Sequence, residues 1–141
     1  MFRLLLVVIL LPLTLQAKEN PPQYRGEFTM RYAQFIHEFQ GRDWQQMKKY
    51  ETETTKCGLG PGEEGIGCIE KVYSNNHECI SEVLFALKQG CKIHNSKGEI
   101  LCISPPQWRD QSIIILGARA SFTYNAEKNI ISVNHLICGG D

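Results

Sequence analysis

The sequence predicts an α+β domain in which N-terminal helices pack on a curved, mainly antiparallel sheet that is stapled by disulfides. Three observations favour this class. Apolar residues recur at helical spacing near the start of the chain, they alternate with polar residues near its end, and six cysteines lie within residues 57–138. The chain of 141 residues is long enough for one domain with its own core.

Residues 1–17 have the layout of a secretory signal sequence. One positive charge, Arg3, precedes an apolar run over residues 4–15, and the small residue Ala17 follows. The run is shorter than the roughly 17–25 apolar residues that a membrane-spanning helix needs. We therefore expect cleavage after Ala17, a flexible lead over residues 18–26, a single α+β domain over residues 27–141, and no membrane span after cleavage. The expected location is periplasmic or secreted, and the absence of an Asn-x-Ser/Thr sequon favours a bacterial setting.

The charges of the chain are balanced. Fifteen Lys and Arg face fifteen Asp and Glu, so no global basic field would attract nucleic acid or an anionic membrane. The glycine-rich stretch over residues 58–67 lacks the cation or hydroxyl that a phosphate-binding loop uses, and it carries Glu63 and Glu64 instead. We therefore expect a surface loop at this point, no nucleic-acid partner and no cofactor.

A wide apolar stripe predicts a first helix from about Glu27 to Gln40, which Gly41 ends. Asp43 has the character of an N-cap for a second, short helix. A short strand is predicted within residues 52–57. The members of the helical stripe are Phe28, Tyr32, Phe35, Ile36 and Phe39.

Another helix is predicted between Asn75 or Asn76, either of which can cap it, and Gly90, which suits a left-handed C-terminal cap. A small hairpin follows this helix. If residues 95–98 form its turn, the register places Cys91 directly opposite Cys102.

The longest apolar strand material lies in a hairpin at the end of the chain. Residues 112–124 alternate apolar and polar, residues 125–129 form the turn, and residues 130–138 return. Gly117 is the expected position of a bulge or bend. On the return strand, His135 falls on the more apolar parity and is therefore expected to face the core.

Six cysteines in an exported chain predict three disulfides. Cys79 and Cys91 cannot pair, because a helix between them would hold them roughly 18 Å apart. The hairpin register makes Cys91–Cys102 the preferred bridge, and the sequence leaves the two bonds among the other four cysteines unassigned. The six are Cys57, Cys68, Cys79, Cys91, Cys102 and Cys138.

The stretch FIHEFQGRDWQQMKKYE, residues 35–51, resembles the turn that joins the first two helices in many domains of the nuclear transport factor 2-like superfamily, which has a cystatin-like, cone-shaped α+β fold. The predicted order of elements is similar as well. By that resemblance a curved sheet would wrap the first helix, and Tyr32, Ile36 and His135 would line a pocket at the open end of the cone. The last two strands lack an acidic residue on their apolar parity, where an enzyme of this type would keep its general base.

Devices that stabilise the fold are plentiful in this sequence, whereas catalytic groups are scarce. The predicted function is therefore an exported, disulfide-stabilised binding module for a protein or small ligand, inhibitor-like or immunity-like, with Tyr32 and His135 as candidate ligand-binding residues. The alternative is a small pocket enzyme of the isomerase or dehydratase type that uses His135 with Tyr32 or Tyr124.

A zinc site is a remote third interpretation. It would be formed by residues that stand close together in the two hairpins, namely Cys91, His94, His135 and Cys138. Exported thiols are usually oxidised, so no metal is expected.

Overall fold

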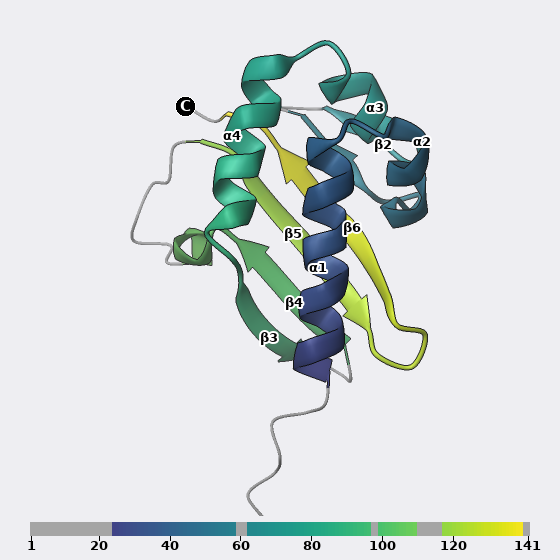
Figure 1. Cartoon of the computed structure of the whole chain (residues 1–141), viewed down its shortest axis with the longest axis vertical. Helices are drawn as coiled ribbons and strands as arrows, with labels where there is room; N and C mark the ends of the chain where they lie inside the picture. The colour runs from purple at the N-terminus through teal and green to yellow at the C-terminus, as the bar shows by residue number, and fades with distance from the viewer. Residues whose placement is uncertain (1–23, 59–61, 97–98, 110–116, 140–141) are drawn as a thin grey trace, which may run out of the picture.

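The computed structural model describes residues 24–58, 62–96, 99–109 and 117–139. The predicted signal sequence, and the predicted lead up to residue 23, lie outside the described residues. Helices and strands follow one another along the chain as shown in Figure 1. In order, they are α1 (Tyr24–Gln40), α2 (Trp44–Met47), the 3-10 helix η1 (Lys48–Tyr50), β1 (Lys56–Cys57), β2 (Glu63–Glu64), α3 (Cys68–Tyr73), α4 (His77–Lys88), β3 (Lys92–Ser96), β4 (Glu99–Ser104), the 3-10 helix η2 (Pro106–Arg109), β5 (Arg119–Asn125) and β6 (Ile130–Ile137).

Six strands of the described chain form one sheet in the order β2-β1-β6-β5-β4-β3. Neighbouring strands run antiparallel except β1 and β6, which are parallel. The two long helices, α1 and α4, cover the same face of the sheet (Figure 1). The α+β class with helices on a mainly antiparallel sheet is therefore confirmed. The sheet is not closed, and β2 and β3 form its two edges.

Helix α1 buries its apolar stripe against the sheet. Phe28, Phe35 and Phe39 are almost fully enclosed, and the ring of Phe35 packs edge-on against Phe122 of β5 with centroids 4.9 Å apart. The helix begins at Tyr24, earlier than the predicted start at Glu27. The last residues of the predicted lead therefore belong to α1.

Carboxylates satisfy the N-terminal amides of the two short helices. Asp43 caps α2 as predicted, because its Oδ1 accepts a hydrogen bond from the backbone N–H of Gln46 at 3.3 Å. The buried Glu51 does the same for α3, where its two oxygens accept from the N–H groups of Gly67 and Ile69, each at 2.8 Å. Helix α3 was not predicted from the sequence, because six residues are too few to show a helical period.

Helix α4 has the predicted boundaries. The side chain of Asn76 accepts from the backbone N–H of Cys79 at 3.2 Å, and Gly90 takes a left-handed φ of 82° just past the end of the helix. Ile80, Val83 and Leu87 are buried under it. The cap residues and the apolar face together make this helix predictable from the sequence.

The β3–β4 hairpin has a register two residues away from the predicted one. Ile93 lies opposite Cys102, and the pairing continues to Ser96 and Glu99. The predicted register, which placed Cys91 directly opposite Cys102, is therefore wrong. The disulfide between these two cysteines nevertheless forms, since diagonal neighbours are also within reach and their Cα atoms are 5.4 Å apart.

The β5–β6 hairpin contains a bulge in its return strand. Phe122 pairs with Val133 and Ser121 pairs with His135, so the register skips Asn134. The extra residue reverses the alternation of the strand, and His135 shares the face of Ser121, which is the face away from the helices. The prediction that His135 faces the core is therefore wrong.

Gly117, the predicted position of the bulge, lies just before β5. Its φ of 118° is a conformation that side-chain-bearing residues rarely adopt, so the glycine directs the chain into the strand rather than interrupting it. The first part of the predicted strand, residues 112–116, lies outside the described residues.

All six cysteines are paired, as Cys57–Cys68, Cys79–Cys138 and Cys91–Cys102. The preferred bridge is confirmed, and the two bonds that the sequence left open are now assigned. Three disulfides are consistent with an extracellular or otherwise oxidising compartment. Within the described ranges, no helix combines the length and the apolar character that crossing a membrane requires.

Candidate functional site

Tyr32 of α1 lies in the core and is hydrogen-bonded to the ends of two other elements. Its hydroxyl donates to the backbone carbonyl of Leu87 at 2.7 Å and lies 3.3 Å from Oγ of Ser104. Burial raises the pKa of Tyr32 to about 12, although the hydrogen bond with Ser104 opposes this effect. Its neighbour on the predicted pocket lining, Ile36, is partly buried against the core. The phenol therefore ties α1 to α4 and β4, and its proton is not easily lost.

Tyr124 is hydrogen-bonded to the tip of the β5–β6 hairpin. Its ring is fully buried beside Phe28, and its hydroxyl donates to Oδ1 of Asn129 at 2.9 Å and lies 3.4 Å from a carboxylate oxygen of Glu27. Asn129 has a left-handed φ of 50°, which asparagine tolerates better than most residues. The tyrosine thus holds the turn in a fixed shape against α1.

His135 lies on the other face of the sheet from Tyr32 and Tyr124. Its Nδ1 is 3.1 Å from Oγ of the buried Ser121, and Lys56 of β1 stands beside it in the sheet register. Partial burial, assisted by the positive charge of Lys56, lowers the pKa of His135 below its usual value. The three residues of the predicted enzyme site are therefore not brought together.

Substitution of His135 by glutamine is expected to flatten the dependence of stability on pH. Because the histidine binds a proton more readily in the unfolded chain than in the folded one, acid favours unfolding, and the wild type loses stability as the pH falls from about 7.5 to 5. Urea unfolding across this range measures the effect. The control is the same substitution at the exposed His37 of α1, H37Q. Equal slopes of stability against pH for H135Q and wild type would contradict the lowered pKa of His135.

Disulfide bonds occupy the cysteines of both candidate metal sites. Cys91 and Cys138 of the predicted zinc set are each bonded to another cysteine and offer no thiolate. A second group of possible ligand atoms comprises Glu51, Cys57 and Cys68. Here too the sulfurs are joined to each other, and the carboxylate caps α3.

On the part of the surface that the structure describes, three depressions adjoin the β5–β6 turn. The first, which we name the basic recess, has a volume of about 290 Å³ and is lined by Arg31, Lys49, Tyr50, Lys128, Asn129, Ile130 and Ile131. The second, of about 440 Å³, shares two of these residues and is lined by Glu27, Met30, Arg31, Gln34 and Asn129. The third, of about 470 Å³, is polar and is lined by Thr52, Thr54, Glu99, Thr123, Asn125, Lys128, Ile130, Ser132 and Asn134.

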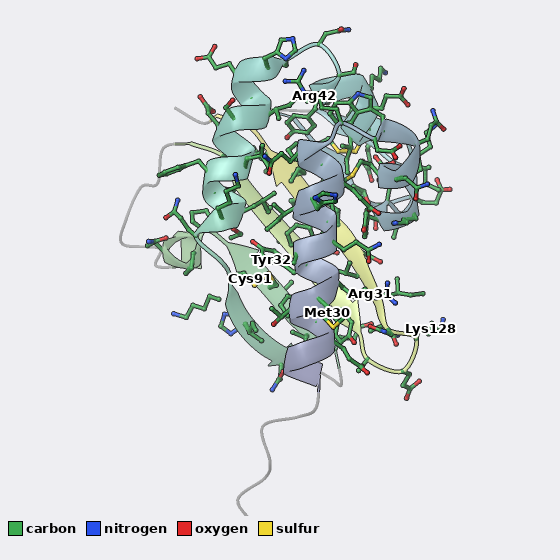
Figure 2. The ribbon with its side chains drawn as sticks, in the orientation of Figure 1. Met30, Arg31, Tyr32, Arg42, Cys91 and Lys128 are labelled. Carbon is green, nitrogen blue, oxygen red and sulfur yellow. A yellow bond between two sulfur atoms is a disulfide. The ribbon has the colours of Figure 1, made fainter. Side chains whose placement is uncertain are left out.

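The cations of the basic recess come from three separate elements. Arg31 projects from α1, Lys49 from η1 and Lys128 from the β5–β6 turn. Arg31 and Lys128 are labelled in Figure 2, where both lie toward the hairpin tip. Within the described chain, no carboxylate is within ion-pair distance of Arg31 or Lys128, so both keep their charge available to a ligand.

Neutral side chains hold the guanidinium group of Arg31 in place. Its Nε donates to Oδ1 of Asn129 at 3.3 Å, and its Nη1 donates to Oε1 of Gln34 at 3.2 Å. Asn129 also accepts from Tyr124, so one amide oxygen joins the helix to the turn. These contacts orient the arginine without cancelling its charge.

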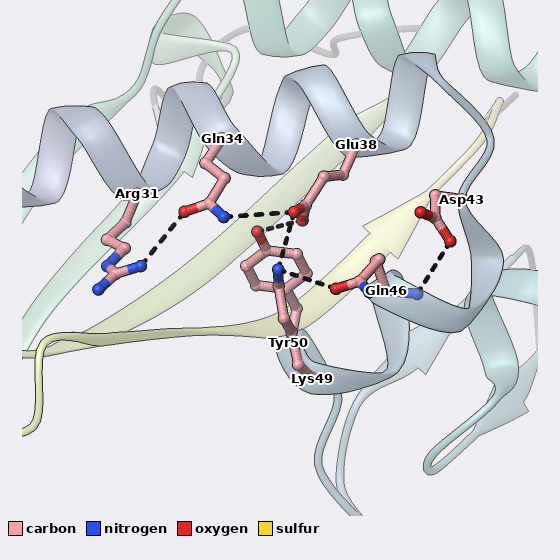
Figure 3. Close-up of polar contacts among 7 residues, drawn as sticks. All are labelled: Arg31, Gln34, Glu38, Asp43, Gln46, Lys49 and Tyr50. Atoms are coloured by element: carbon pink, nitrogen blue, oxygen red, sulfur yellow. Dashed lines mark hydrogen bonds and ion pairs between the residues drawn. The ribbon is translucent and has the colours of Figure 1, made fainter.

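Glu38 is hydrogen-bonded to two residues that line the basic recess, Lys49 and Tyr50 (Figure 3). Its carboxylate accepts from Nζ of Lys49 at 2.8 Å, from the hydroxyl of Tyr50 at 2.5 Å and from Nε2 of Gln34 at 3.2 Å. Although partial burial opposes ionisation, these hydrogen bonds and the charge of Lys49 outweigh it and lower the pKa of Glu38. Burial, and then the proximity of Glu38, raise the pKa of Tyr50, while the charge of Arg31 acts in the opposite direction.

Sequence reasoning did not find the basic recess. Arg31, Lys49 and Lys128 are spread over about a hundred positions, and each has the ordinary character of a solvated surface charge. A signal existed only in part, as the turn-forming stretch over residues 125–129 placed Lys128 and Asn129 at an exposed tip.

Family models, characterised proteins and solved structures were compared with this chain, and none matches it significantly. The likeness of residues 35–51 to the nuclear transport factor 2-like superfamily stays a prediction from the sequence.

Proposed function

We propose that the protein is an exported binding module, stapled by its three disulfides, that binds another protein through the surface around the β5–β6 turn. In this respect it would act like a small inhibitor or immunity protein. The observation that carries the proposal is the meeting of three depressions at residues 128–130 of one ordered turn. The signal-like residues 1–17 and the disulfides support export.

The surface around the turn has the composition of a protein-binding site. Met30 and Ile130, which are 72% and 46% exposed, are two of the large apolar side chains that the described surface leaves uncovered, and both line depressions at the turn. Arg31 and Lys128 stand next to them. Apolar anchors beside arginine are typical of residues that contribute most to protein–protein binding.

The proposal favours binding over catalysis because of how the candidate catalytic groups are used. Tyr32 and Tyr124 donate hydrogen bonds that connect elements of the fold, and His135 contacts Ser121 on the far face of the sheet. A general acid or base must reach a substrate atom within hydrogen-bond distance. None of these three lines any of the depressions at the turn.

Site-specific photo-crosslinking tests the proposal. A photoreactive amino acid replaces Lys128 in one variant and the exposed Lys88, at the end of α4, in a matched control. Both proteins are exposed to the exported fraction of the source cells. We expect a discrete protein adduct from position 128 and none of the same mass from position 88.

The adduct is then tested with purified components. K128E is expected to weaken binding of the purified partner at least about tenfold, because it reverses a charge at the centre of the surface, whereas K88E should change affinity by less than about twofold. Equal adducts from both positions, or equal affinity of K128E and wild type, would contradict the proposed surface.

A further inference from the structure

We infer that the basic recess is a binding site for an oxyanion, either a carboxylate or a phosphate group. This inference rests on the proposed binding surface and adds the chemistry that the surface recognises. It depends on three features of the recess, which are its uncompensated charge, the prior orientation of its arginine and its size.

The charge of the recess is positive. Arg31, Lys49 and Lys128 contribute three cations, and the one acid bonded to any of them is Glu38, which pairs with Lys49. Counting only described residues, the cations of the recess and the acid paired with them carry three positive charges and one negative, or a net charge of plus two. A bound dianion, or a carboxylate with a second polar oxygen nearby, would neutralise it.

Arg31 is already held in the orientation that an oxyanion needs. Hydrogen bonds to Asn129 and Gln34 use its Nε and one proton of Nη1, and they leave the protons of Nη2 for a ligand. A guanidinium edge that is fixed before binding loses little freedom when it pairs with two oxygens of a carboxylate or phosphate. Gln34 also donates to Glu38, so a chain of hydrogen bonds runs from Arg31 to the carboxylate side of the site (Figure 3).

The β5–β6 turn also contributes to the lining of the recess. Asn129 accepts hydrogen bonds from Nε of Arg31 and from the hydroxyl of Tyr124, and its neighbour Lys128 lines the recess as well. Ile130 and Ile131 add apolar surface to the lining of the recess, and charge interactions beside apolar surface are less screened than in open water.

The volume and the neighbouring acids limit the ligand. About 290 Å³ lies at the small end of ligand sites and accommodates one phosphate group or one acidic side chain. Glu27 lines the adjoining depression, and Glu127 stands beside Lys128 in the turn. Glu27 would repel a second anionic group placed in the adjoining depression, so the site favours a single compact oxyanion.

NMR titration of the disulfide-bonded protein tests the inference with two probes, inorganic phosphate and an acetylated Gly-Glu-Gly amide peptide, at low ionic strength. We expect at least one probe to shift the Nε–Hε signal of Arg31 and the backbone amides of residues 128–130 saturably, with a Kd on the order of 1 mM. Saturation by phosphate alone assigns a phosphate ligand, and saturation by the peptide assigns an acidic side chain.

Charge-neutral variants show whether the binding is local. R31Q is expected to weaken binding about tenfold and K128Q about threefold. R42Q and K88Q are the matched controls, since Arg42 lies at the far end of α1 (Figure 2) and Lys88 on α4, and they should stay within about twofold of wild type. Non-saturating shifts with both probes, or equal weakening by the controls, would overturn the inference.

The two proposals can fail separately. If position 128 crosslinks a protein while neither probe binds, the recess is not an oxyanion site although the surface still binds a partner. If a probe saturates the recess while no protein adduct forms, the oxyanion site stands and the proposed protein partner does not.

Discussion

Replacing Cys79 and Cys138 by serine is expected to lower the free energy of unfolding by about 4 kcal/mol, because this bridge closes a long loop in the unfolded chain. The two cysteines are 59 residues apart, whereas each of the other disulfides joins residues 11 apart. In the chain-entropy description, the loss for each short loop is about 3 kcal/mol. The bridge also joins the first turn of α4 to the end of β6, which no other disulfide does.

Urea unfolding of three double-serine variants, one for each bridge, measures how much each disulfide contributes to the free energy of unfolding. The comparison needs oxidised protein with the remaining two bridges intact, which a thiol titration verifies. A variant lacking Cys79–Cys138 that is at least as stable as the variant lacking Cys91–Cys102 would show that loop length does not determine the contribution of these bridges.

Truncation of Phe35 to alanine is expected to destabilise the fold by about 3–5 kcal/mol. The side chain is fully buried at the centre of an aromatic cluster, where its ring lies 4.9 Å from that of Phe122, 5.0 Å from that of Tyr50 and 6.0 Å from that of Phe39. Its removal leaves a cavity between α1, η1 and β5 that rigid neighbours cannot fill. Chemical denaturation monitored by circular dichroism measures the loss.

Phe85 provides a matched control for this truncation. It is also a phenylalanine in a helix, but it is 72% exposed on α4. F85A should therefore change stability by no more than about 0.5 kcal/mol. Comparable losses in F35A and F85A would contradict the position of the core between α1 and the sheet.

Elements with a strong local pattern could be predicted from the sequence. The stripe of α1 repeats at helical spacing over several turns, and the cap at Asn76 with Gly90 brackets α4. The turn at residues 125–129 is likewise marked by its own residues. In each case the physical cause lies within a few neighbouring positions, so the sequence carries it directly.

Features that depend on pairing between distant strands could not be predicted. The bulge at Asn134 is defined by the residues of β5 that oppose it, and one skipped position moved His135 to the other face of the sheet. The register of β3 and β4 was misplaced because the turn was assumed to begin at residue 95. Local alternation gives the parity of a strand only as far as its next bulge.

The basic recess could not be predicted from the sequence for a similar reason. Arg31 is oriented by Asn129, 98 residues away, whose amide oxygen accepts a hydrogen bond from Nε of the arginine. The turn between α1 and α2 brings Lys49 within hydrogen-bond distance of Glu38. Three cations that look independent in the sequence therefore line one recess only after the chain has folded.

The parallel pairing of β1 with β6 affects the order in which the molecule can be assembled. β1 and β2 join the rest of the sheet through β6, the last strand of the described chain, and β1 contacts it through pairs such as Lys56 with His135. As the chain is synthesised, the N-terminal half can close the short Cys57–Cys68 loop before the later strands exist. β1 cannot pair with the rest of the sheet until β6 has been synthesised. Cys138, the partner of Cys79, follows β6 in the chain. Vectorial synthesis therefore leaves the Cys79 thiol exposed to wrong partners for longer than any other cysteine.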